Sequence, residues 1–312
     1  MKKQEASQTE AGPRRDLYDE ISSNRWKTMI IFVMFFIMIG VFGWLFGLYI
    51  GDVIVGFVMA SLFCAVYCPI AYMAGDSMIL TVSSARPATK QEFPFLHNTV
   101  EGLAMAAGIP MPRVFVIDDT AINAFATGRS PERAAITVTT GALKRLKRTE
   151  LEGVIAHEMS HIKNFDIRVM MLAAVLVGVI ALLSDFFLRG VLYGNRGNDD
   201  REGGNGAAIL IVIGIVLAVL SPIIAQMIHL AVSRRREYLA DASGAMLTRY
   251  PRGLADALKR IRDDKEPVVD TANKATAHLY IANPLRNTRG LVVGLFATHP
   301  DINDRIGRLE SM

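Results

Sequence analysis

The chain has 312 residues, enough for one large soluble domain or two small ones, but its composition argues against a purely soluble protein. Hydrophobic residues make up 51% of the sequence, the mean hydropathy is +0.30, and the apolar residues are concentrated in long blocks. The net charge of +4 is modest and no basic run is interleaved with aromatic residues, so we expect no nucleic-acid partner. The two cysteines, Cys64 and Cys68, lie within one apolar block and cannot build a disulfide framework.

Two apolar blocks near the N-terminus predict a pair of membrane-spanning helices. The first covers residues 28–49, and about 22 helical residues reach roughly 33 Å, enough to cross the hydrocarbon core of a bilayer. Gly51 and Asp52 then provide a tight turn before the second block at residues 53–74. A signal peptide is the alternative for the first block, but the block is too long and lacks a small-x-small cleavage site.

Two further apolar blocks predict a third and a fourth span. The third covers residues 169–188 and the fourth covers residues 207–232. Pro222 lies inside the fourth block together with the polar residues Gln226 and His229, which indicates a kinked helix that is partly lined by protein. Glycine and asparagine are frequent between the two blocks, so residues 189–206 predict an exposed, flexible loop.

Lysine and arginine residues close to the span ends predict the orientation of the chain. The basic residues on one side of the four spans are Arg14, Arg15, Arg25, Lys27, Arg86, Lys90, Lys163, Arg168, Arg234, Arg235 and Arg236. On the other side, the first loop has no lysine or arginine, and the arginines of the second loop are offset by acidic neighbours. Both termini and the polar segments are therefore expected in the cytoplasm, with the lipid bilayer as a partner.

These features predict a multi-pass protein of the plasma or inner membrane, mainly α-helical, with four transmembrane helices and a soluble α+β part. The expected segments are a cytoplasmic tail at 1–27, a transmembrane hairpin at 28–75, a first cytoplasmic part at 76–168, spans three and four at 169–232, and a second cytoplasmic part at 233–312.

The first cytoplasmic part shows strand and helix signals. Residues 113–117 predict a buried strand, and the apolar runs at 122–127 and 134–139 flank a turn that indicates a hairpin. Thr149 and Glu152 match a capping box, which predicts that a helix begins there.

That helix carries His157, Glu158 and His161 in the order H-E-x-x-H. Residues i and i+4 of a helix share one face, so the two imidazoles can bind one Zn²⁺ together. The intervening Glu158 can reach a water that the metal has activated and accept its proton without binding the metal. Two unrelated surface histidines are the alternative, but the pattern is rare by chance. The sequence therefore predicts one zinc ion per chain and a catalytic base.

A catalytic zinc needs a third protein ligand and one open position. Glu237, directly after the fourth predicted span, is the best candidate. Asp241 lies one helical turn further on the same face and suits a hydrogen-bond partner for a ligand histidine. Spacing alone leaves open that both residues belong to a solvated acidic face of a helix.

HEMSH together with RRREYLAD resembles the HtpX family of membrane zinc proteases, which is related to the CAAX prenyl endopeptidases. Three further segments match the family pattern: 123–128, 278–284 and 298–306. The resemblance implies a zincin-type (gluzincin) domain, zinc bound by His157, His161 and Glu237, and Glu158 as base. It also implies a metalloendopeptidase that acts on damaged or misfolded membrane proteins and unfolded polypeptides under stress.

The resemblance also implies a small substrate-binding β-sheet. Its edge strand would hold the substrate backbone as an added strand and would consist of Asn123, Ala124, Phe125, Ala126 and Thr127. His299 and Arg305 match positions that line the cleft, where either could stabilise the oxyanion. A structural salt bridge remains the alternative for Arg305, and a structural or cleft-wall role remains the alternative for His299.

Three other functions are weighed against this one. A CAAX-type prenyl-protein endopeptidase shares the chemistry but would carry more spans. A non-catalytic, zinc-binding membrane adaptor would not need Glu158. A metal transporter would need acidic or histidine residues in facing spans, where the sequence offers Asp185 and His229.

Overall fold

The computed structural model of the chain describes residues 17–194, 234–264, 276–281 and 300–312. Several predictions fall wholly or partly outside these residues: most of the tail, the loop beyond residue 194, the fourth span at 207–232, parts of the segments 278–284 and 298–306, and the position of His299.

The N-terminal half begins with the predicted helical hairpin, formed by α1 (Leu17–Ile50) and α2 (Val53–Val82). Gly51 takes a left-handed φ of 86° at the turn, and the carboxylate of Asp52 accepts hydrogen bonds from the first free backbone N–H groups of α2. Residues 26–48 and 53–82 are each long and apolar enough to cross a membrane. Together they account for the two predicted spans of the hairpin.

The second helix continues beyond the predicted apolar block and reaches the part of the molecule that contains the sheet. Asp76, in this extension, is buried and forms an ion pair with Arg113 at the start of β2 (Arg113–Ile117). One turn earlier, the Tyr72 ring lies 5.6 Å from the guanidinium carbon of Arg129. The end of α2 is therefore fixed to the sheet, which connects the hairpin to the sheet and its surrounding helices.

The sheet has four strands in the order β1-β2-β4-β3, where β1 is Arg86–Pro87, β3 is Ala124–Thr127 and β4 is Ala135–Thr139. Strands β2 and β4 run parallel, whereas β3 is antiparallel to β4, with Ala124 opposite Val138. The predicted strand and hairpin are confirmed, and β3 is an edge strand.

Helices surround the sheet and bury a common core. They are α3 (Pro94–Ala107), α4 (Thr140–Arg145), α5 (Arg148–Lys163), α8 (Arg234–Thr248), α9 (Pro251–Arg262) and α10 (Ile302–Glu310). Helix α5 runs through the centre, and its residues from Gly153 to Ile162 are all buried.

The start of α5 differs from the prediction. The helix begins at Arg148, and the backbone N–H of Lys147 donates to Glu150 Oε2 at 2.6 Å. Thr149 and Glu152 therefore do not form the predicted capping box. The physical reason is tertiary: Glu150 is buried and paired with Arg260 of α9 at 2.7 Å, which holds its side chain at the helix start.

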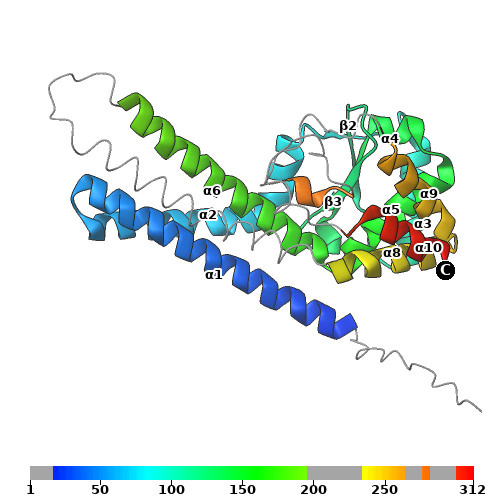
Figure 1. Ribbon diagram of the computed structural model, residues 1–312, viewed down its shortest axis with the longest axis horizontal. Coiled ribbons are helices and arrows are strands. Elements are labelled where there is room, and N and C mark those ends of the chain that lie inside the picture. The colour runs from blue at the N-terminus through cyan, green and yellow to red at the C-terminus, as the bar shows by residue number, and fades with distance from the viewer. Residues whose placement is uncertain (1–16, 195–233, 265–275, 282–299) are drawn as a thin grey trace, which may run out of the picture.

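Helix α6 (Asp166–Gly194) covers the third predicted span and packs against α1 and α2 in a second apolar cluster. Figure 1 shows α1, α2 and α6 extending to one side of the molecule, away from the sheet and the shorter helices. The described residues are thus mainly helical with a small mixed sheet, as predicted. The short 3₁₀ helix η2 (Ala277–Leu279) lies against α6 and β3.

Candidate metal centre

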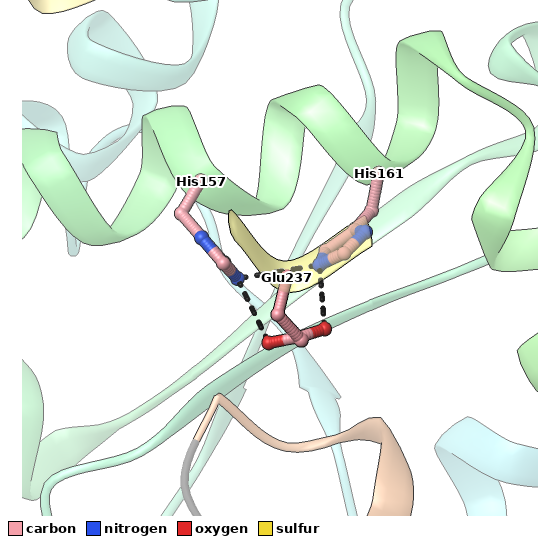
Figure 2. A group of neighbouring side chains, drawn as sticks. All are labelled: His157, His161 and Glu237. Atoms are coloured by element: carbon pink, nitrogen blue, oxygen red, sulfur yellow. Dashed lines mark hydrogen bonds and ion pairs between the residues drawn. The ribbon is translucent and has the colours of Figure 1, made fainter. Parts of the chain in front are cut away.

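Helices α5 and α8 bring the three predicted ligands together. His157 and His161 point from the same face of α5, and their Nε2 atoms are 3.2 Å apart. Glu237 of α8 approaches from the other side, with one carboxylate oxygen 3.4 Å from His161 Nε2 and the other 3.8 Å from His157 Nε2 (Figure 2). The three ligand atoms lie within 4.8 Å of one another and all three residues are buried. Two imidazole nitrogens and one carboxylate are a donor set that fits zinc.

The sequence of α8 explains why Glu237 reaches this position. Glu237, Asp241 and Gly244 follow at i, i+4 and i+7, so they share the face that meets α5. A Cβ at Gly244 would lie 3.0 Å from the backbone nitrogen of His157, closer than ordinary packing allows. The missing side chain therefore permits the close approach of α8 to α5.

Each ligand histidine uses its other ring nitrogen to contact a buried carboxylate. His157 Nδ1 lies 2.9 Å from Asp241 Oδ1, and His161 Nδ1 lies 3.0 Å from Asp166 Oδ2. Such contacts fix the ring orientation and leave Nε2 for a metal. The sequence predicted the partner role of Asp241 but not that of Asp166. Its position five residues after His161, where the chain enters an apolar block, is the one signal that indicates Asp166.

Arg305 forms a buried ion pair with Asp241, next to the metal centre. It is 2% exposed, and its Nε and Nη2 donate to the two carboxylate oxygens of Asp241 at 2.9 and 2.7 Å. Its Nη1 donates to the carbonyl of Ile281 at 3.2 Å. Of the two roles left open for Arg305, the geometry shows the salt bridge.

The buried groups of the centre have strongly perturbed pKa values. Burial raises the pKa of Glu158 to about 7. Burial opposes the charged form of His161, but the hydrogen bonds that its ring donates to the carboxylates of Asp166 and Glu237 outweigh it and raise its pKa to about 10. Burial alone would raise the pKa of Asp241, yet Arg305 and His157 lower it to about 2. Such a concentration of perturbed groups is typical of a functional site.

The predicted substrate strand lies beside Glu158, and Asn123 and all of β3 are buried. The backbone N–H of Ala126 interacts with the Glu158 carboxylate and lowers its pKa, against the larger rise caused by burial. The carbonyl of Ala124 accepts the N–H of Ile281 at 3.0 Å, and the rings of Phe125 and Tyr280 pack edge to face with centroids 4.9 Å apart. The chain's own segment 276–281 thus covers part of the edge, a contact that sequence reasoning did not predict.

Comparisons with known proteins agree with this geometry. The pattern of peptidase family M48 matches residues 90–312. The protease HtpX homologue of Dictyoglomus turgidum is 45% identical over 300 residues, covering 95% of this chain and 94% of that relative. The homologue of Dictyoglomus thermophilum is 46% identical over 299 residues with the same coverage.

Among solved structures, the crystal structure of S. mikatae Ste24p matches with a TM-score of 0.47 and 19% identity, over 94% of this chain and 66% of that one. The family pattern spans more than half of the sequence, and the HtpX homologues match nearly all of it. The chain therefore belongs to peptidase family M48, within the HtpX group of membrane proteases.

Proposed function

We propose that the protein is a membrane-integrated, zinc-dependent endopeptidase with a gluzincin fold and four transmembrane spans. It would cleave misfolded or damaged membrane proteins at the cytoplasmic face during stress. The observation that carries the proposal is the buried convergence of His157, His161 and Glu237 with Glu158 on the same helix. Membership of a family of membrane proteases supports it.

The residues divide the work between metal binding and proton transfer. His157, His161 and Glu237 would hold the zinc. When bound, zinc supplies the Lewis acidity that activates water and polarises a peptide carbonyl. Glu158 accepts the proton of the attacking water and passes it to the leaving amine, a task suited to a carboxyl whose pKa is raised to about 7.

The substrate would bind along β3 as an extended strand. Strand addition uses the outward N–H and C=O groups of an edge strand, and the outward groups here belong to Ala124 and Ala126. Because the N–H of Ile281 occupies the Ala124 carbonyl, a substrate would pair at Ala126 or displace segment 276–281. Because β3 packs against α5 and the N–H of Ala126 interacts with Glu158, a backbone aligned on this edge would pass beside the base. This arrangement recognises main chain rather than particular side chains, which suits unfolded segments of many proteins.

The decisive experiment uses purified full-length protein in detergent. Casein and a destabilised membrane protein are the substrates, and each is tested with and without a chelator. Glu158→Gln is the matched control because it removes the base and keeps the three metal ligands. The wild type should cut internal peptide bonds, the chelator should abolish cleavage, and added zinc should restore it. Glu158→Gln should keep about one zinc per chain and lose several orders of magnitude in turnover.

The other outcomes separate the alternatives. Near-normal turnover of Glu158→Gln would contradict the role of Glu158 as base. A wild type that holds zinc but cuts neither substrate would indicate an adaptor, and cleavage confined to prenylated C-terminal peptides would indicate a CAAX-type endopeptidase. Products that lack only terminal residues would exclude an endopeptidase.

A further inference from the structure

Asp166 and Arg236 form a buried ion pair directly behind the second histidine of the centre. Arg236 Nη1 donates to Asp166 Oδ1 at 2.9 Å, and Asp166 Oδ2 lies 3.0 Å from His161 Nδ1. The side chains of Asp166 and Arg236 are only 3% and 5% exposed. Both carboxylate oxygens are therefore engaged, one by the ligand histidine and one by the guanidinium.

Stability alone does not account for such a pair. The cost of removing two charges from water often exceeds their attraction in a protein interior, and apolar residues of similar volume frequently serve as well. Asp166 is also oriented by its second contact: the Arg236 guanidinium fixes one oxygen, which aims the other at His161. This geometry suits the orientation of a ligand better than the packing of a core.

The other histidine shows the same construction. Asp241 contacts His157 Nδ1 and is held by Arg305, just as Asp166 contacts His161 and is held by Arg236. The two arrangements differ in their place in the chain. Asp241 shares α8 with the ligand Glu237, whereas Asp166 is the first residue of α6, and Arg236 directly precedes Glu237.

We propose that Asp166 is a positioning residue for His161, that Arg236 holds it in place, and that together they set the affinity of the metal centre. The proposal rests on the proposed function, because it requires that His157, His161 and Glu237 bind a metal. It also makes the starts of α6 and α8 part of the centre. A shift of either helix start would turn the His161 ring away from the point where the three ligands meet.

The test compares zinc affinity by competition with a chelator in full-length protein. Asp166→Leu combined with Arg236→Met removes both charges of the pair at once, so neither of the two is left buried without the other and the protein should stay folded. We expect zinc affinity to fall about 10- to 100-fold, the usual loss when a hydrogen-bond partner of a ligand is removed. The single variant Arg236→Lys keeps a cation beside Asp166 and should retain most of the wild-type affinity for zinc.

A matched control is available on α5, the helix that carries His161. Glu150→Gln with Arg260→Met removes a second pair with a buried carboxylate, Glu150–Arg260, which lies at the opposite end of α5 from His161. This double variant should bind zinc as the wild type does. The Co²⁺-substituted proteins give a second readout, since the visible absorption bands report ligand geometry. The bands should shift in the Asp166 variants and remain unchanged in the control.

The outcomes distinguish this inference from the function on which it rests. A wild type that binds neither zinc nor Co²⁺ would overturn the proposed metal centre itself. A wild type that binds zinc, combined with an Asp166→Leu/Arg236→Met variant of equal affinity and identical Co²⁺ spectrum, would overturn the positioning role alone. If the double variant does not fold, Asp166→Asn, which preserves size, is measured in its place with the same expectations.

Discussion

Glu237 comes from a helix that follows the histidines by more than seventy residues, so it is the ligand whose assignment most needs a test. Glu237→Ala should abolish stoichiometric zinc binding, as should His157→Ala and His161→Ala. The reason is that the centre offers His157, His161 and Glu237 as ligands, and a zinc site of this kind needs all of them. Metal analysis of the purified variants provides the measurement. Full zinc content in Glu237→Ala would show that another residue is the third ligand.

Arg305 offers a second test at the scale of a single residue. Arg305→Met leaves Asp241 buried without its cation, so the free energy of unfolding should fall by about 3–5 kcal/mol. Denaturant titration of the metal-free protein measures this loss. Removal of the exposed salt bridge Arg308–Asp304 by Arg308→Met should change stability by less than about 1 kcal/mol. Wild-type stability with strongly reduced turnover in Arg305→Met would favour the oxyanion role instead.

The sequence was informative about residues wherever the chemistry is local. His157, Glu158 and His161 lie within one and a half turns of a helix, so their spacing alone predicts how they converge. Glu237 required resemblance to a family, since spacing could not exclude a solvated acidic face. The contact of Asp166 with Arg236 and the contacts of Arg305 join segments that are more than sixty residues apart or lie on separate helices, and no local pattern encodes them.

At the scale of elements, the close approach of α8 to α5 has a simple test. Gly244→Ala places a Cβ 3.0 Å from the backbone nitrogen of His157, so α8 must move outward and carry Glu237 with it. We expect zinc affinity to decrease and stability to fall by about 1–3 kcal/mol. Gly102→Ala, in the exposed middle of α3 with no atom within 4 Å, should be neutral or stabilise by up to about 1 kcal/mol. Unchanged zinc affinity in Gly244→Ala would contradict this account.

The cover over β3 makes a second prediction for elements. Tyr280 is fully buried against Phe125, and the next residue, Ile281, donates its N–H to Ala124. Tyr280→Ala should loosen segment 276–281 and accelerate hydrogen exchange in peptides that contain Ala124–Thr127. Exchange in β2, which lies on the far side of β4, serves as the internal control. Equal protection of β3 in variant and wild type would show that the segment does not shield the edge.

The strands were predictable because each is a short apolar run bounded by turn residues, and the structure places them within two residues of the expected ends. The start of α5 was less predictable. The capping-box pattern of Thr149 and Glu152 places the start too late, because the contact of buried Glu150 with Arg260 holds the Glu150 carboxylate at the N–H of Lys147. The coverage of β3 by residues 276–281 joins parts of the chain that are far apart, beyond what strand patterns can show.

For the whole molecule, the central prediction is its orientation in the membrane. Single cysteines at Asn198, Arg129 and Asp256, in a Cys64→Ser, Cys68→Ser background, can be probed with an impermeant thiol reagent on intact cells. The basic residues on one side of the spans predict that only the Asn198 position reacts from outside. All three should react once the cells are opened. External labelling at Arg129 or Asp256 would reverse the orientation and exclude cytoplasmic substrates.

The metal ligands also have a consequence for how the chain can be divided. His157 and His161 precede α6 and Glu237 follows the fourth predicted span, so the ion would join two parts of the sequence that the third and fourth predicted spans separate. Residues 1–200 and 201–312, expressed together as separate polypeptides, should therefore reassemble into an active pair. Zinc would be coordinated by residues of both fragments and would hold them together. Their association should therefore strengthen with zinc concentration, since a ligand stabilises the state that binds it. A fragment expressed alone would hold at most two of the three ligands and should remain inactive.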